Sequence, residues 1–259
     1  MDDHVPVPEG LGRLAPEHGA KAALDLISRI PVREPHRIAD VYRGRGSMTA
    51  LLVRRFPDAE IEAFELSRSI DGPAEALSPA RQDADDPRPG ARRKFDLICS
   101  SGSPEMAPSL PRLLPMLLGR VAARGYLAVQ YPNDLYEPRR AVMRMVAADG
   151  PWAKTLLPIA KTRAFNQTMD HLYGLLSPIC AAVDIWETTY LDAMASVAAV
   201  VEWMEATRLA PFLTALEEAD RRKFLDRYTA ELRQAYSTLP DGRVLLRSRR
   251  LFVLAQPRA

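Results

Sequence analysis

Near its start the chain places a short β-type segment, a glycine turn, a helix and a second β-type segment in direct succession. Residues 37–41 are mostly apolar and are followed by Gly44 and Gly46, and residues 49–56 carry apolar side chains at helical spacing. Residues 59–65 then alternate between apolar and acidic side chains. This order predicts a βαβ unit, in which a helix joins two parallel strands. Parallel strands need helices on both faces of their sheet, so few fold classes remain.

The alternation of strands and helices continues along the rest of the chain. Strand-like runs occupy residues 95–99, 125–130, 183–190 and 250–255, and helical runs occupy residues 21–30, 110–121, 196–207 and 219–236. Residues 139–178 are mostly helical, with Pro151 and Pro158 expected as breaks. The sequence therefore predicts an α/β fold: a Rossmann-like, doubly wound sheet with a helical cap inserted among the late strands.

The length of 259 residues fits one large domain or one domain with an insertion, at roughly 150 residues per domain. We expect an N-terminal helical segment over residues 1–36. A Rossmann-like core should follow over residues 37–138 and 183–259, and a helical substrate cap over residues 139–182 and 196–236. The cap should stand over the carboxyl edge of the sheet, where open α/β sheets bind their ligands.

Composition argues against several other classes of protein. The formal net charge of +2 and 26% charged residues provide no basic surface for nucleic acid. No signal peptide is visible, and no apolar run approaches the ~18 residues of a membrane helix, so we expect no membrane partner. Two cysteines, Cys99 and Cys180, cannot build a disulfide framework, which favours a cytoplasmic protein. The four histidines show no metal-ligand spacing, so no metal is predicted.

The glycine turn and the end of the second strand make the strongest candidate site. Glycines at a strand-to-helix turn let the backbone approach a ligand closely. Glu65 lies about 20 residues further on, where a carboxylate can accept hydrogen bonds from both ribose hydroxyls of an adenosine moiety. The sequence therefore predicts an adenosine-containing cofactor at residues 40–46 and Glu65.

Several segments together carry a family resemblance. They are the turn at residues 40–46 with the helix start at residues 47–52, and the segments 95–98, 127–130, 137–138, 183–186, 188–190 and 250–253. On these segments the chain resembles the class I S-adenosylmethionine-dependent methyltransferases, and most closely the trans-aconitate 2-methyltransferase family. The resemblance runs from about residue 20 to the C-terminus, and the run Asp-Ile-Trp-x-Thr-Thr-Tyr at residues 184–190 is its most specific part.

The resemblance implies S-adenosylmethionine as cofactor and a small carboxylic acid as substrate. It assigns the cofactor to Asp40, Tyr42, Gly44, Gly46, Glu65 on the ribose, Asp83 near the adenine, and Ser100 and Ser101 beside the methionine moiety. It assigns the substrate to His171, Tyr173 and Arg250. Methyl transfer to a carboxylate depends mainly on positioning in a dry pocket, so no catalytic acid or base is assigned.

Two departures from the family pattern leave alternatives open. Tyr42 stands where the family has its first motif glycine, and Arg43 and Arg45 add positive charge near the place of a sulfonium cation. The alternative is therefore a methyltransferase-like protein that has lost methyl transfer, either a catalyst of another reaction or a non-catalytic binding partner.

The second departure concerns the substrate. The family's Thr-Gly-Leu-Arg-Pro segment reads Thr207-Arg208-Leu209-Ala210-Pro211 here, so its arginine has moved or been lost. The hypothesis that follows is an acceptor with fewer, or differently placed, carboxylates than aconitate.

Overall fold

The computed structural model describes residues 18–42, 48–66, 77–79, 94–102, 110–162 and 167–258. In these residues seven strands form one sheet in the order β3-β2-β1-β4-β5-β7-β6. The strands are β1 (Arg37–Tyr42), β2 (Glu60–Leu66), β3 (Leu77–Pro79), β4 (Phe95–Ser101), β5 (Val121–Pro132), β6 (Cys180–Met194) and β7 (Val244–Pro257). β1, β2, β4 and β5 are parallel, β7 is antiparallel to both of its neighbours, and β3 is antiparallel at the edge. The predicted doubly wound α/β fold is confirmed.

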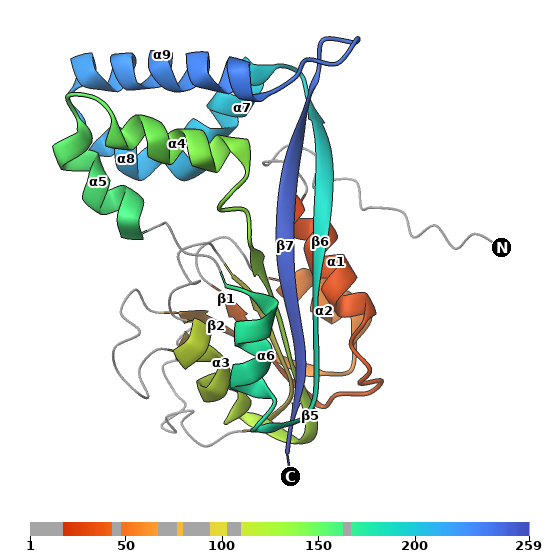
Figure 1. Ribbon diagram of the computed structural model, residues 1–259. Helices are drawn as coiled ribbons and strands as arrows, with labels where there is room; N and C mark the ends of the chain where they lie inside the picture. The colour runs from red at the N-terminus through yellow and green to blue at the C-terminus, as the bar shows by residue number, and fades with distance from the viewer. Residues whose placement is uncertain are drawn as a thin grey trace.

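Helices cover both faces of the sheet (Figure 1). α1 (His18–Ser28) and α2 (Thr49–Arg55) pack on one face, in an apolar cluster with Ile38, Cys99 and Phe252. α3 (Leu110–Leu118) and α6 (Met169–Leu176) pack on the other face with Ile98 and Leu251. Because side chains alternate along a strand, neighbouring residues of one strand serve two different cores.

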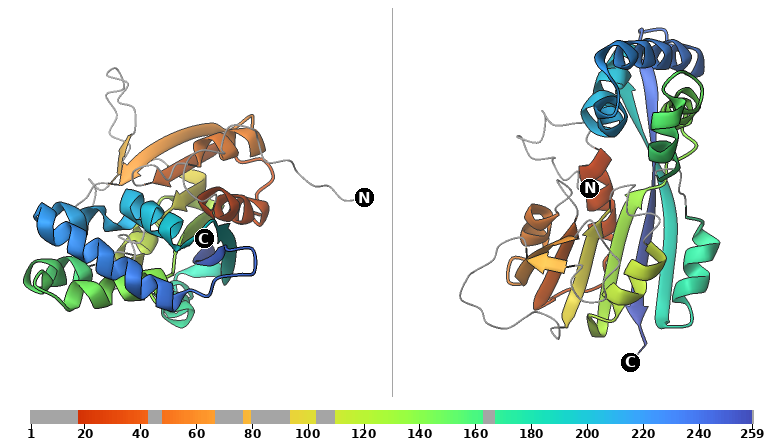
Figure 2. Two further views of the ribbon diagram at one scale, coloured as in Figure 1. Left: turned by 90° about the horizontal axis from the view of Figure 1, so that it is seen from above. Right: turned by 90° about the vertical axis from the view of Figure 1, so that its left-hand side faces the viewer.

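The remaining helices form a separate lobe beyond one end of the sheet (Figures 1 and 2). They are α4 (Pro138–Ala148), α5 (Ala153–Thr162), α7 (Val197–Met204), the π-helical turn η2 (Glu205–Leu209), α8 (Ala210–Thr214) and α9 (Glu218–Ala235). Their shared core includes Trp152, Phe212, Phe224 and Tyr228. No helix in the part of the chain that the structure describes is long and apolar enough to cross a membrane.

Two long strands connect this helical lobe to the sheet. β6 has 15 residues and β7 has 14, and the two pair along their length from Cys180 and Pro257 to Met194 and Val244. Val244 and Leu246 belong to the core of the lobe, whereas Leu251 and Val253 belong to the core of the sheet. The hairpin thus contributes buried residues to the core of the lobe and to the core of the sheet.

Two details of the segment 139–178 differ from the expectation. α6 packs on the sheet through Leu172 and Leu176, and not among the helices of the lobe. Helical periodicity shows which face of a helix is apolar but not which surface that face meets. Pro158 lies inside α5 and does not end it. Pro158 is exposed, and because it has no N–H the helix lacks one hydrogen bond there, to the carbonyl group of Lys154.

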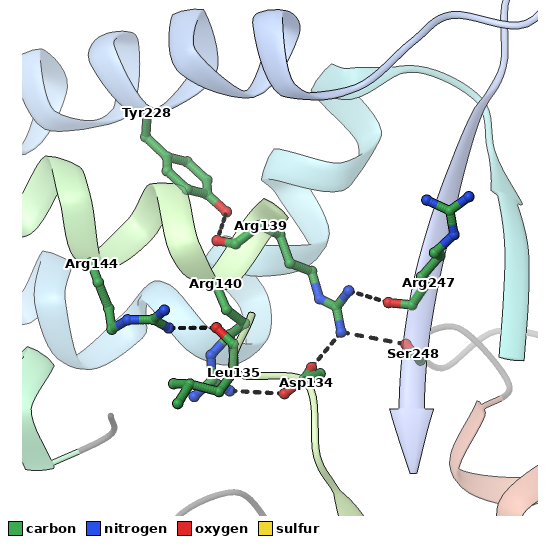
Figure 3. Close-up of polar contacts among 8 residues, drawn as sticks. All are labelled: Asp134, Leu135, Arg139, Arg140, Arg144, Tyr228, Arg247 and Ser248. Carbon is green, nitrogen blue, oxygen red and sulfur yellow. Dashed lines mark hydrogen bonds and ion pairs between the residues drawn. The ribbon is translucent and has the colours of Figure 1, made fainter. Parts of the chain in front are cut away.

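A buried arginine joins the lobe to the sheet (Figure 3). Arg139 is 1% exposed, and its guanidinium donates to the carboxylate of Asp134 and to the main-chain carbonyl of Arg247 on β7. The Tyr228 hydroxyl on α9 donates to the Arg139 carbonyl at 3.0 Å. One residue therefore ties together the β5–α4 connection, strand β7 and helix α9.

Replacement of Arg139 should destabilise the whole protein. Arg139→Met leaves the buried Asp134 carboxylate with less compensation, so we expect a loss of about 3–5 kcal/mol of unfolding free energy. The matched control is Arg227→Met, since Arg227 forms an exposed ion pair with Asp149 and its removal should cost less than about 1 kcal/mol. Urea unfolding followed by tryptophan fluorescence measures both, and equal losses would contradict the assigned role of Arg139.

Candidate active site

The register of the sheet aligns the predicted cofactor residues at one edge. Tyr42, the last residue of β1, pairs with Glu65 on β2 and with Ser101 on β4. Ser101 in turn pairs with Gln130 on β5, and Gln130 pairs with Phe252 on β7. These are the carboxyl ends of the parallel strands, where ligands of open α/β sheets bind. The positions therefore form one row across the sheet, directly below the helical lobe.

Asp40 holds the start of α2 against the end of β1. Its side chain is fully buried, and Oδ2 accepts hydrogen bonds from the Met48 amide at 2.9 Å and from the Thr49 hydroxyl at 2.6 Å. A carboxylate at a helix N-terminus interacts favourably with the helix dipole. Asp40 thereby joins the last residues of β1 to the first residues of α2.

The structure places the other predicted cofactor residues as follows. Gly44, Gly46 and Asp83 lie outside the described residues, and Glu65 is defined by its strand register alone. Ser100 and Ser101 are successive residues of β4, so their side chains point to opposite faces of the sheet. Ser101 shares a face with Gln130, whereas Ser100 is completely buried on the other face. The structure therefore brings Ser101, and not Ser100, to the face of the sheet that carries Gln130.

Arg250 lies on the same face as Ser101 and Gln130. It pairs with Pro132, two residues after Gln130 on β5, and so lies closer to the lobe. Its Nη1 donates to Gln130 Oε1 at 3.2 Å, and its buried Nε–H has no hydrogen-bond partner among the described residues. Burial, together with the nearby Arg208, lowers the pKa of Arg250 to about 10. Desolvation and like charge thus disfavour this cation, and a bound anion would relieve both effects.

The neighbouring arginines of β7 have other roles. Arg249 points to the opposite face, where its Nη2 contacts Glu187 Oε1 at 2.5 Å. The main-chain carbonyl of Arg247 accepts the hydrogen bond from Arg139, and its side chain is exposed. Of the basic run on this strand, the structure directs Arg250 into the site.

The neck between lobe and sheet holds an excess of positive charge. Burial alone would raise the pKa of Asp134, but Arg139, Arg140, Arg208 and Arg250 outweigh it and lower that pKa. Arg208 on η2 affects the pKa of both Asp134 and Arg250, so the lobe brings Arg139, Arg140 and Arg208 to this region and the sheet brings Arg250. Glu137 is a second carboxylate in this region, and four guanidinium groups against two carboxylates still leave room for further anionic charge.

Strand β6 and helix α1 close the site on the other side of Arg250. The Tyr190 hydroxyl donates to Asp25 on α1. Burial and Asp25 raise the pKa of Tyr190, and the charge of Arg250 opposes that rise. Trp186 stacks on Phe252 with ring centroids 4.9 Å apart, and Arg29 of α1 lies over Trp186 at 4.4 Å. These contacts fasten α1 to the face that carries Arg250.

His171 and Tyr173 do not lie with Arg250. Both are on α6, which packs on the opposite face of the sheet through Leu172 and Leu176. Tyr173 is 56% exposed, and the His171 amide donates to Thr168 Oγ1 as part of the helix N-cap. The structure therefore separates these two residues from the third predicted substrate residue.

Sequence reasoning missed Gln130, Asp134, Arg139 and Arg140. Gln130 carried one usable signal, because it is a polar residue near the end of an otherwise apolar run. Asp134 lies in the polar connection after Pro132, and Arg139 and Arg140 lie in the first turn of α4; this stretch of sequence is typical of an exposed loop and helix start. Their burial depends on the lobe, which no local pattern reveals.

The strand order, the antiparallel β7 and the acidic residues Asp40 on β1 and Glu65 on β2 define a class I methyltransferase fold. The similar solved structures include a putative methyltransferase from Bacillus halodurans, with a TM-score of 0.51, 12% identity, and coverage of 91% of this chain and 99% of that one. No family model matches the chain.

Curated relatives identify the family within that class. A trans-aconitate 2-methyltransferase of Yersinia pestis is 39% identical over 239 residues, which are 91% of this chain and 92% of the relative. One of Methylobacterium radiotolerans is 39% identical over 242 residues, with the same coverage of each chain. The chain belongs to the trans-aconitate 2-methyltransferase family. It is thus an S-adenosylmethionine-dependent methyltransferase, as its resemblance to that family implied.

The contacts of Asp40 lead to a test of the cofactor site. Asp40→Ala removes the acceptor for the Met48 amide and the Thr49 hydroxyl, so we expect S-adenosylhomocysteine to bind about tenfold or more weakly. Thr49→Val removes one of these two hydrogen bonds and should cause a smaller loss. Calorimetric titration measures both, with Asp241→Ala in the exposed turn before β7 as the control. Unchanged affinity in a folded Asp40→Ala protein would refute this role.

Proposed function

We propose that the protein transfers a methyl group from S-adenosylmethionine to a carboxylate of a small organic acid carrying at least two carboxylates. The observation that carries this proposal is the buried Nε–H of Arg250 beside the carboxyl edge of the sheet, which has no hydrogen-bond partner in the part of the chain that the structure describes. A guanidinium presents its N–H groups in a planar fork that matches a carboxylate. The relatives named above, which are trans-aconitate 2-methyltransferases, support the same class of acceptor.

Different residues serve the cofactor and the acid. Asp40 holds the start of α2 beside the end of β1, and Glu65, at its register position near the end of β2, would hold the ribose hydroxyls. When bound, S-adenosylmethionine would supply a methyl group on a sulfonium: an O–C bond to the carboxylate would form as the S–C bond breaks, S-adenosylhomocysteine would leave, and no proton would be transferred. Arg250 therefore needs to hold the acid in line and away from water, and no residue has to act as acid or base.

The position of Arg208 favours a polycarboxylate acceptor. The sequence alone suggested an acceptor with fewer or differently placed acids, since the family's arginine is missing at Ala210. In the structure the charge of Arg208 acts on Arg250 across the neck. Two cations from different parts of the molecule suit two carboxylates of one acceptor better than a single one.

The state of the cysteines supports a cytoplasmic location for this reaction. Cys99 and Cys180 are both buried and unbridged. Burial raises the pKa of each thiol, so both remain protonated and poorly reactive near neutral pH. Such thiols fit a reducing compartment, and the net charge of +2 gives no reason to add a nucleic acid partner.

The proposed reaction is tested by binding first and by turnover second. We expect S-adenosylmethionine and S-adenosylhomocysteine to bind at micromolar concentration, and trans-aconitate to accept a methyl group far better than a monocarboxylic acid such as crotonate. Calorimetry and mass spectrometry of the methyl ester measure the two steps. If neither cofactor binds at millimolar concentration, Tyr42 has abolished the cofactor site and the alternative of a repurposed or non-catalytic protein stands.

Removal of the guanidinium at position 250 should weaken binding of the acid and leave binding of the cofactor nearly unchanged. We expect Arg250→Met to raise the KM for the acid about tenfold or more, because a charge-assisted hydrogen bond to a desolvated carboxylate is lost. S-adenosylhomocysteine affinity should change less than about threefold. Arg243→Met removes an equally charged residue from the exposed turn before β7 and should leave both quantities unchanged. An unaltered KM in Arg250→Met would contradict the assigned role.

A further inference from the structure

We propose that Gln130 is a positioning residue that aims the guanidinium of Arg250 at the acid and turns the hydroxyl of Ser101 outward as a hydrogen-bond donor. The proposal rests on the function proposed above and extends it to a residue that does not itself touch the acid. It follows from the hydrogen bonds and the burial of three side chains on three strands.

Gln130 occupies a completely enclosed position between the other two residues. Its side chain is 0% exposed, on β5 between β4 and β7. Oε1 accepts a hydrogen bond from Arg250 Nη1 at 3.2 Å, and Nε2 donates to Ser101 Oγ at 2.5 Å. Both ends of the amide are therefore used, and a continuous hydrogen-bonded chain crosses the sheet from β7 to β4.

The chemistry of arginine sets the direction of this chain. A guanidinium has donors and no acceptor, so the group of Gln130 that faces Arg250 must be the amide oxygen. The amide nitrogen then faces Ser101, whose oxygen has to accept. The Ser101 hydroxyl hydrogen is left to donate elsewhere, and Ser101 is only partly buried at the end of β4. The serine thus offers a donor toward the edge where Tyr42 and Glu65 lie in register.

A neutral amide suits this position better than a carboxylate would. Gln130 restrains Nη1 of Arg250 without cancelling its charge, while Nε is left without a partner among the described residues. A carboxylate at the same place would form an ion pair with Arg250 and compete with the acid for it. It would also accept from Ser101 and so turn the serine hydroxyl inward.

Two substitutions of Gln130 should therefore fail in different ways. Gln130→Glu keeps Arg250 in place and neutralises it, so we expect the KM for trans-aconitate to rise about tenfold or more, with kcat reduced less than about threefold. Gln130→Met has a similar shape and leaves Arg250 charged but unrestrained, so we expect the larger effect on kcat.

Binding of trans-aconitate in the presence of S-adenosylhomocysteine, followed by calorimetry, supplies a readout that needs no turnover. Gln130→Glu should weaken this binding about tenfold or more, and Gln130→Met should weaken it less. Ser101→Ala removes the outward donor and should leave the acid affinity nearly unchanged while lowering kcat. The control is Gln256→Glu, the same chemical change on β7, where the side chain donates to the exposed Arg124 carbonyl; it should behave as the parent.

The proposal is overturned if the folded Gln130→Glu and Gln130→Met proteins lose acid affinity and kcat in the same proportion, since a purely structural role predicts that result. It is also overturned if both keep the parent's values. Thermal unfolding reports whether each variant folds. If Gln130→Glu does not fold, the test uses Gln130→Met, which should lower kcat more than acid affinity, and Ser101→Ala, which should lower kcat and leave acid affinity nearly unchanged. Failure of the proposed function looks different, because the parent protein itself would then neither bind trans-aconitate nor methylate it.

Discussion

The buried ion pair between Asp134 and Arg139 determines where the helical lobe stands over the sheet. Asp134 follows β5 directly, and Arg139 lies in the first turn of α4. Because the same guanidinium also bonds the main chain of β7, the lobe cannot shift without uncovering a charge that is expensive to desolvate. The lobe in turn brings Arg208 toward Arg250, so the composition of the candidate acid site depends on this single contact.

The electrostatics of the neck point to the same kind of ligand as its geometry. The carboxylate of Asp134 lies among four arginines, two of which it contacts directly. Burial of Arg250 disfavours its charge, and Gln130 restrains it with a neutral oxygen. A region that gathers cations yet compensates them only in part is stabilised when a multiply charged anion binds. The protein's ordinary net charge conceals this local excess.

Much of the fold followed from local patterns, with particular exceptions. β1, β2, β4, β5 and α9 lie within a few residues of their predicted positions, because each has a clear period of alternation or of helical spacing. At Gly242 φ is 83°, a left-handed conformation that glycine adopts without strain. The pattern missed β3 and α8, which are too short to show a period, and it underestimated the length of β6 and β7. A strand shared by two cores carries two overlapping patterns of burial.

The sequence by itself determined the class of fold, the family and the positions of Asp40, Glu65 and Arg250, because these depend on motifs and on the period of single elements. Only the tertiary structure decided which faces of the sheet Ser100, Ser101, His171 and Tyr173 occupy. It also decided that Gln130 joins Ser101 to Arg250 and that Arg208, on the lobe, lies close enough to lower the pKa of Arg250. The physical reason is that hydrogen bonds and charges act through space, between strands and helices that lie far apart along the chain.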